Sequence, residues 1–199
     1  MRIVLGSTSK SRNELFKLAL PEGVHLIDER LNPDIDEKAI RHTDPHKLVL
    51  AIANAKADVI EAQAKPLADM MVTADSVIVF GDAIREKPES EAQAKEFLQS
   101  YGKTGIPAKC TTGVVVTNLK NGKRASAVDE SLQYFDEIPD EVAHQIIEVG
   151  EIMFCAGGFV LEEPLIYPYI GKREGEEEAV RGMPIAATKK LIIDTIAAM

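Results

Sequence analysis

The 199-residue sequence contains no tryptophan, two cysteines and few aromatic residues, which make up 5% of the chain. So few aromatic side chains leave little material for a surface on which nucleic-acid bases stack. The two cysteines, Cys110 and Cys155, make no disulfide framework of the kind that supports small secreted proteins. A reducing compartment therefore fits this chain.

The sequence also has no excess of basic residues and no long apolar run. Its formal net charge is −9, whereas a long nucleic-acid surface normally presents a basic face. A few local cations are still enough to bind a small anionic ligand. No apolar run is long enough to span a bilayer, and the first apolar stretch is too short for a signal peptide. We therefore expect a cytoplasmic protein that binds neither nucleic acid nor membrane.

What is present is an alternation of strand-like and helix-like segments, which indicates an α/β protein. Because 45% of the residues are hydrophobic, the chain can bury a core, and we expect one domain over residues 1–199 with room for two lobes. The expected strands cover residues 2–6, 24–28, 70–80, 111–118 and 126–135; the expected helices cover 9–20, 45–64, 90–100 (ending before Gly102), 139–149 and 184–198. Residues 154–161 are expected to form a glycine-broken strand or loop, and 164–182 an irregular segment.

The first sixteen residues, "MRIVLGSTSKSRNELF", predict a short buried strand, a turn at Gly6 and then a helix. Backbone N–H groups at the start of such a helix point outward, and the helix dipole favours negative charge there. Ser7 adds a hydroxyl group and Arg12 adds a cation that suits phosphate geometry. An ordinary strand-to-helix turn has the same pattern, so this stretch alone leaves both interpretations open.

Three charged residues further along the chain stand out. Asp75 lies inside the apolar strand 70–80, where an ionised carboxylate is costly unless it is paired, hydrogen-bonded or bound to a metal. Lys56 falls within the apolar stripe of helix 45–64. Lys87 follows in the loop "REKPES". The alternatives are that Asp75 caps a neighbouring loop, that Lys56 extends its ammonium group to solvent, and that Lys87 is simply solvated.

Taken together, these residues suggest chemistry on a polyphosphate. Arg12, Lys56 and Lys87 supply three cations that could neutralise phosphate oxygens, and Asp75 with Glu37 supplies two carboxylates that could hold a divalent metal or activate water. The sequence contains no G-x-x-x-x-G-K-[ST] loop and no cluster of cysteine and histidine with metal-ligand spacing.

Over nearly its whole length, the sequence resembles a known family, the Maf family of nucleoside triphosphate pyrophosphatases. No single block is specific, but the order and spacing of the blocks carry the resemblance. The blocks are "LGSTSKSRNEL" (5–15), "DIDE" (34–37), "AIANAKADVI" (51–60), "TADSVIVF" (73–80), "EKPESEAQAKEFL" (86–98), "TTGVVV" (111–116), "CAGGFVLE" (155–162) and "VRGMPI" (180–185).

The resemblance implies an elongated, two-lobed α/β fold with a mixed sheet, flanking helices and a central cleft, similar to that of inosine triphosphatases. It implies hydrolysis of a nucleoside triphosphate between the α and β phosphates with Mg²⁺, or with Mn²⁺ or Co²⁺, and it leaves a homodimer open. It also implies roles for individual residues: Asp75, Lys56 and Lys87 in catalysis, Asp75 and Glu37 as metal ligands, and Ser7, Arg12, Glu37, Ser76 and Glu162 in substrate binding.

The family that the sequence resembles is divided by preferred base into members that prefer pyrimidine nucleotides and members that prefer 7-methylguanosine triphosphate. Ser11, Cys155 and Glu162 are similar to members that prefer 7-methylguanosine triphosphate, whereas Ser76 fits neither group cleanly. We therefore expect an enzyme that clears modified or surplus nucleotides, with 7-methyl-GTP favoured and dTTP or UTP as the alternative. A non-catalytic nucleotide-binding regulator of cell division is the alternative of another class, although such a protein has no need of Asp75. A purely structural interaction domain would leave both Asp75 and Lys56 unexplained.

Overall fold

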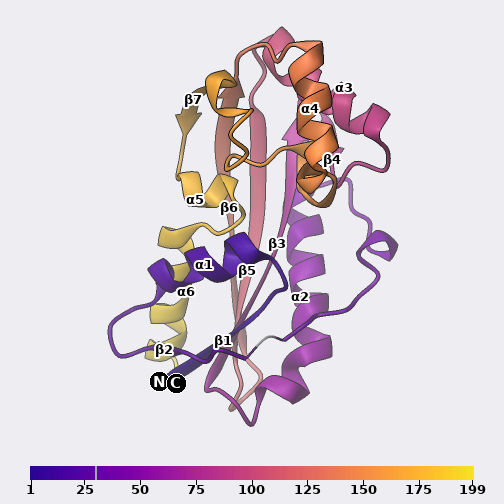
Figure 1. Ribbon diagram of the computed structural model, residues 1–199. Coiled ribbons are helices and arrows are strands. Elements are labelled where there is room, and N and C mark those ends of the chain that lie inside the picture. The colour runs from indigo at the N-terminus through magenta and orange to yellow at the C-terminus, as the bar shows by residue number, and fades with distance from the viewer. Residues whose placement is uncertain (30) are drawn as a thin grey trace. The chain divides into compact units, whose positions relative to one another are not determined.

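The computed structural model describes residues 1–29 and 31–199 of the chain. Its centre is a mixed sheet in which the strands follow the order β2-β1-β3-β5-β6-β7, with β4 pairing with β3 (Figure 1). The strands are β1 (Arg2–Gly6), β2 (His25–Leu26), β3 (Met70–Phe80), β4 (Ala83–Arg85), β5 (Ala108–Asn118), β6 (Arg124–Phe135) and β7 (Ile170–Glu174). The prediction of an α/β protein with a mixed sheet and flanking helices is confirmed.

Six α-helices and several short 3₁₀ turns accompany the sheet in the described part of the chain. The helices are α1 (Lys10–Phe16), α2 (Pro45–Ala64), α3 (Glu91–Thr104), α4 (Asp140–Val149), α5 (Glu177–Val180) and α6 (Ile185–Ala197). The 3₁₀ turns are η1 (Lys17–Ala19), η2 (Glu37–Ala39), η3 (Glu151–Phe154), η4 (Ala156–Gly158) and η5 (Tyr167–Tyr169). None of the described helices is long and apolar enough to cross a membrane.

The chain divides into two compact units. The first unit comprises residues 1–75, 112–129 and 182–199, and the second unit comprises 76–111 and 130–181. The long strands β3, β5 and β6 contribute residues to both units. The two units are described one after the other below.

In the first unit, helices cover both faces of the sheet. Strand β1 runs parallel to β2 and to β3, with Ile3 opposite Met70. Because successive side chains of a strand point to opposite faces, the even-numbered residues 70, 72 and 74 of β3 pack with α1 and α6, whereas Met71 packs with α2. By the same alternation, Thr73 and Asp75 face α2. The Oγ of Thr73 donates a hydrogen bond of 2.8 Å to the backbone oxygen of Ala53 in α2.

Helix α2 begins where the sequence predicts. The side chain of Asp44 accepts hydrogen bonds from the backbone nitrogens of His46 (2.8 Å) and Lys47 (3.3 Å), and Pro45 occupies the first helical position. Gly6 was expected to form a turn, but in the structure it allows close packing, because a β-carbon there would collide with the side chain of Ile60. Helix α2 can therefore lie directly against the end of β1.

The second unit contains two strands that the sequence did not predict. Strand β4 pairs antiparallel with β3, with Ile78 opposite Arg85, and β7 pairs antiparallel with β6, with Leu132 opposite Glu174. The prediction that residues 164–182 are irregular is therefore wrong for β7 and α5. Strand β7 ends the strand order of the sheet, and β4 pairs with β3 outside that order. Both strands are too short to show a clear alternation of polar and apolar residues.

Helix α3 also differs from its prediction, since it continues through Gly102 to Thr104 and ends at Gly105, whose φ of 68° is left-handed. A β-carbon on Gly102 would collide with the backbone of Asp136, so the glycine serves close packing rather than helix termination. The start of α3 is as predicted, because the Oγ of Ser90 accepts a hydrogen bond of 3.2 Å from the backbone nitrogen of Gln93.

Candidate active site

The central feature of the first unit is a buried lysine between two carboxylates. The Nζ of Lys56, from α2, lies 2.7 Å from Oδ1 of Asp75 in β3 and 2.7 Å from Oε1 of Glu37 in η2. Lys56 and Asp75 are each only 7% exposed, whereas about a third of the Glu37 side chain is exposed. Three residues predicted from the sequence are thus brought together. We refer to Lys56, Asp75 and Glu37 as the lysine–carboxylate cluster.

The cluster decides between the alternatives that the sequence left open. Lys56 does not extend to solvent, and Asp75 accepts a hydrogen bond from the Lys56 ammonium group rather than capping a loop through that oxygen. Removing one partner of such a buried pair typically costs several kcal/mol, because the other charge is left without compensation. Replacing a buried ion pair by well-packed apolar residues is often neutral or stabilising, so the cluster is weak evidence for a role in stability alone.

Arg12 is tied to the backbone beside the cluster. Its Nε donates to the backbone oxygen of Gly182 (2.8 Å), and its Nη1 donates to the backbone oxygen of Ala74 (3.1 Å), the residue before Asp75. These bonds fix the guanidinium group relative to β3. Arg12 is therefore a positioned cation rather than a mobile surface charge.

The loop between β1 and α1 is shaped by its own side chains. Ser9 caps α1, since its Oγ accepts from the backbone nitrogen of Arg12 at 3.3 Å, and the buried Ser7 accepts from the backbone nitrogen of Ser9 at 3.2 Å. The side-chain amide of Asn13 donates to the backbone oxygens of Ser7 (3.0 Å) and Ser9 (2.7 Å). Sequence reasoning missed Asn13, although an amide one turn into a helix that follows a serine-rich loop is a recognisable sign.

The cluster is also where a divalent metal would fit. Mg²⁺ is usually held by one or two carboxylates together with phosphate oxygens of the substrate, rather than by a cage made only of protein ligands. Asp75 and Glu37 supply two carboxylates that already converge on one cation, the Lys56 ammonium group. Within residues 1–29 and 31–199, no group of three or more His, Cys, Asp or Glu side chains that could hold a metal ion occurs.

In the second unit, the exposed Lys87 follows a rigid anchor formed by Arg85. The Arg85 side chain is buried, and its guanidinium carbon lies 4.1 Å, 4.5 Å and 4.9 Å from the ring centres of Phe80, Phe97 and Tyr101. It also donates a hydrogen bond of 2.8 Å to the Oγ of Ser100. A desolvated cation against aromatic faces is held by about 2 kcal/mol or more.

The backbone of the same loop is anchored from the other side. The backbone oxygen of Glu86 accepts from the nitrogen of Gly157 (3.0 Å), and the oxygen of Gly157 accepts from the hydroxyl group of Tyr101 (2.7 Å). Burial raises the pKa of Tyr101 to about 12, so this hydroxyl keeps its proton. Lys87 is thus preceded by two anchored residues, and the buried Pro88 follows it.

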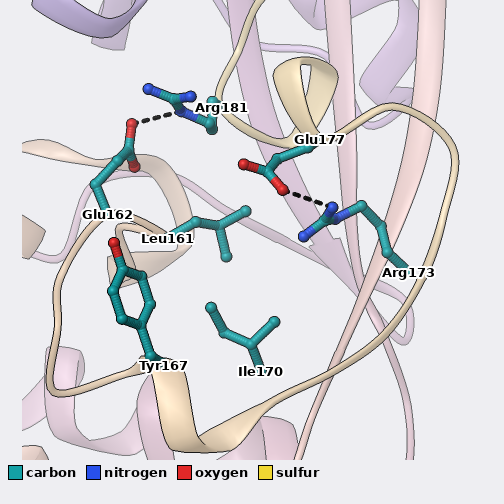
Figure 2. A pocket seen from close by; sticks show the side chains of 7 residues that line it. All are labelled: Leu161, Glu162, Tyr167, Ile170, Arg173, Glu177 and Arg181. Carbon is teal, nitrogen blue, oxygen red and sulfur yellow. Dashed lines mark hydrogen bonds and ion pairs between the residues drawn. The ribbon is translucent and has the colours of Figure 1, made fainter.

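The remaining predicted residues, Ser76 and Glu162, also belong to the second unit. Ser76 is the half-buried residue that follows Asp75 in β3. Glu162 lines a pocket of about 470 Å³, where its Oε1 lies 2.5 Å from Nε of Arg181 (Figure 2). A second ion pair in the same pocket joins Arg173 and Glu177 at 2.7 Å. The lining residues are Leu161, Glu162, Tyr167, Ile170, Arg173, Glu177 and Arg181.

Sequence reasoning chose only Glu162 from this pocket. Arg181 lies within the block "VRGMPI", but a charged residue in the turn between two helices has no periodicity that distinguishes it from a solvated one. Tyr167 likewise lies in a segment that was expected to be irregular.

These features describe an α/β protein whose buried lysine and paired carboxylates suit a phosphorylated ligand. The chain belongs to the Maf-like family of nucleoside triphosphate pyrophosphatases: the model of the family described as Maf-like protein matches residues 2–195. The resemblance seen in the sequence is therefore confirmed.

Individual relatives show the same membership. A protein of Dictyostelium discoideum named 7-methyl-GTP pyrophosphatase is 39% identical over 196 residues, covering 96% of this chain and 95% of that protein. A protein of Chlamydia trachomatis serovar L2 named dTTP/UTP pyrophosphatase is 29% identical over 196 residues, covering 97% and 93%. Among solved structures, a nucleoside-triphosphatase / dITP/XTP pyrophosphatase of Mycobacterium abscessus matches 70% of this chain and 76% of that one, with 12% identity and a TM-score of 0.43.

Proposed function

We propose that this chain hydrolyses a nucleoside triphosphate between the α and β phosphates and releases a nucleoside monophosphate and pyrophosphate. The observation that supports this most strongly is the lysine–carboxylate cluster of Lys56, Asp75 and Glu37. A buried carboxylate can accept a proton from the attacking water, and cations beside it can neutralise phosphate oxygens as charge builds up on the leaving pyrophosphate.

Each residue then has a role. Asp75 is the general base or a metal ligand, Glu37 assists in holding the metal, and Lys56 and Lys87 bind the polyphosphate. Ser7 and Arg12 bind phosphate at the loop that precedes α1, and Ser76 contacts the substrate. A divalent cation, when bound, would neutralise phosphate charge and polarise the bond that breaks.

For the base, we favour 7-methylguanine. The relative with 39% identity carries the name 7-methyl-GTP pyrophosphatase, and Glu162 is a hydrogen-bond acceptor in a pocket that Tyr167 also lines. A guanine edge presents the N1–H and N2–H₂ donors, and methylation at N7 adds positive charge, which strengthens pairing with a carboxylate. The exposed ring of Tyr167 can also attract a positively charged base. In this role the enzyme would clear modified nucleotides.

Two other functions remain as candidates. The Chlamydia trachomatis relative carries the name dTTP/UTP pyrophosphatase, which favours a pyrimidine substrate. A regulator of cell division that binds nucleotides without hydrolysing them would need the cations but would have no use for Asp75.

Product analysis tests the proposal. The protein is incubated with 7-methyl-GTP and Mg²⁺, and the products are separated by ion-exchange chromatography. We expect 7-methyl-GMP and pyrophosphate, no turnover in EDTA, and recovery with Mg²⁺, Mn²⁺ or Co²⁺. Release of orthophosphate with 7-methyl-GDP would contradict the assigned bond, and nucleotide binding without turnover of any triphosphate would favour the regulator.

A further inference from the structure

The pocket of the second unit contains a feature that the proposed function does not use, the contact of Glu162 with Arg181 (Figure 2). The Nε of Arg181 donates to Oε1 of Glu162 at 2.5 Å. The Arg181 side chain is 20% exposed and the Glu162 side chain is 40% exposed, so the pair faces the pocket without being fully solvated. An arginine at this position therefore affects which groups of a ligand can bind to the carboxylate of Glu162.

The charges of the lining residues favour an uncharged or weakly charged group over phosphate. The two guanidinium groups are each paired with a carboxylate, Arg181 with Glu162 and Arg173 with Glu177. Arg173 also donates to Oε1 of Gln133 at 3.0 Å. The four lining charges therefore balance, and Leu161, Tyr167 and Ile170 complete the wall with apolar and aromatic surface. Such a wall suits a planar ring with polar groups along one edge.

We propose that Glu162 and Arg181 act as one unit that recognises the 6-oxopurine edge of a guanine base. This proposal rests on the proposed function, because it takes the base of the nucleotide substrate to be the ring that enters the pocket. The guanine edge presents, in order, the O6 acceptor, the N1–H donor and the N2–H₂ donors. Arg181 uses Nε for Glu162 and carries its other N–H donors on the two Nη atoms, whereas the ionised Glu162 is only an acceptor.

The pair then provides a donor beside two acceptors, which matches this edge. An Nη–H of Arg181 donates to O6, and the two carboxylate oxygens of Glu162 accept from N1–H and N2–H. The ion pair orients the carboxylate before the base arrives, which lowers the entropy cost of binding. Glu162 alone would contact only the two donors and would leave O6 without a partner.

Other bases fit this pattern less well. Adenine turns its N6 amino group toward Arg181, so two donors face each other, and it turns the N1 lone pair toward the carboxylate. Uracil and thymine present O4 to Arg181 and N3–H to one carboxylate oxygen, as guanine does with O6 and N1–H. Their O2, however, is an acceptor that faces the second carboxylate oxygen. Hypoxanthine keeps O6 and N1–H and lacks only the 2-amino group. The expected order of preference is guanine, then hypoxanthine, with adenine last.

The test compares kcat/KM for GTP, ITP and ATP, measured as pyrophosphate release, in the wild type and in Arg181→Leu. We expect Arg181→Leu to lower kcat/KM for both GTP and ITP about tenfold or more, because both bases carry O6, and to leave ATP unchanged or improved. The variant Arg181→Lys keeps the positive charge but loses the planar set of donors, so its kcat/KM for GTP and ITP should lie between those of the wild type and Arg181→Leu. This variant keeps the test decisive if the leucine variant misfolds.

The matched control is Arg124→Leu. Arg124 has a similarly exposed side chain, 22%, and pairs with Asp58 at 2.7 Å in the first unit, so its loss should leave the GTP-to-ATP ratio unchanged. Equal losses for GTP, ITP and ATP in Arg181→Leu, or no loss at all, would overturn the recognition of O6 while the pyrophosphatase function stands.

If the wild type releases pyrophosphate from none of these substrates, the proposed function fails, and binding decides the inference alone. The measurement is then the affinity of the wild type and of Arg181→Leu for GMP and AMP, determined by isothermal titration calorimetry. A GMP preference that disappears in the variant supports the pairing, and equal binding of GMP and AMP by the wild type overturns it.

Discussion

The ammonium nitrogen of Lys56 lies 2.7 Å from Oδ1 of Asp75, and both residues are more than nine-tenths buried. Nineteen positions separate them in sequence, yet the two elements that carry them are locked in register by the hydrogen bond from Thr73 to Ala53. Glu37 completes the set at 2.7 Å. The account given above depends mainly on this arrangement of one cation between two carboxylates.

The first prediction concerns the two lysines. If Lys56 and Lys87 bind phosphate, Lys56→Ala and Lys87→Ala should each weaken all triphosphate substrates by similar factors, at a cost of roughly 1.5–3 kcal/mol in transition-state binding. The measurement is kcat/KM for 7-methyl-GTP, UTP and ATP in each variant. Effects that depend on the base would contradict a phosphate role.

The two lysine variants should differ in stability. Lys56→Ala removes the cation that Asp75 and Glu37 share, so its unfolding free energy should fall by about 3–5 kcal/mol, whereas Lys87→Ala, at an exposed lysine, should change it little. Lys65→Ala is the matched control, because Lys65 is an exposed lysine at the end of the same helix that pairs with Glu61 at 3.0 Å. Urea denaturation of the three variants measures these differences.

A second prediction follows from the anchor behind Lys87. Arg85→Met keeps an unbranched apolar stem but removes the guanidinium cation from the rings of Phe80, Phe97 and Tyr101. Lys87 should then lose its fixed position, and kcat/KM should fall several-fold in the wild-type background. In the Lys87→Ala background the same substitution should have little further effect, since coupled residues do not add.

The double-mutant cycle for Arg85 and Lys87 distinguishes an effect of Arg85 on the position of Lys87 from a general loss of stability. Losses of the same size in both backgrounds would show that Arg85 acts only on the stability of the second unit. Ile192→Val, a conservative change in an apolar cluster of the first unit that contains none of these three rings, serves as the control and should be additive with Lys87→Ala.

The third prediction concerns base choice. Glu162→Gln replaces a pure acceptor by a group that both donates and accepts, which suits uracil and thymine better than guanine. We expect the wild type to hydrolyse 7-methyl-GTP faster than UTP or dTTP, and Glu162→Gln to narrow or reverse that difference. A wild-type preference for UTP or dTTP would contradict the guanine assignment without affecting the pyrophosphatase assignment.

Part of the candidate site could be predicted because buried charges violate a pattern. Asp75 interrupts an apolar strand and Lys56 interrupts an apolar stripe, so each is visible without any structure, and the sheet brings them together as alternation along β3 requires. Glu37 has no such sign. It lies in a single 3₁₀ turn with no periodicity, and only the family resemblance of "DIDE" pointed to it.

The parts that escaped prediction depend on contacts between segments far apart in sequence. In the sequence, nothing distinguishes Arg85 from an ordinary loop residue, but in the structure three rings from β3 and α3 surround it. Arg181 contacts Glu162, which lies nineteen positions earlier, before β7 and α5. The sequence predicts that the helix ends before Gly102, whereas in the structure the missing side chain of Gly102 lets α3 approach the backbone of Asp136. Local propensity carries no information about any of these three contacts.

The most direct test of the account is pyrophosphate release by Asp75→Asn. Asparagine keeps the size of the side chain and an oxygen that can accept from Lys56, and Glu37 remains as a counter-charge, so the fold should persist in circular dichroism and thermal melting. Loss of a general base or metal ligand should lower kcat by at least about 10²-fold. A folded Asp75→Asn protein that releases pyrophosphate from 7-methyl-GTP at nearly the wild-type rate would contradict the assignment of the lysine–carboxylate cluster as the catalytic centre.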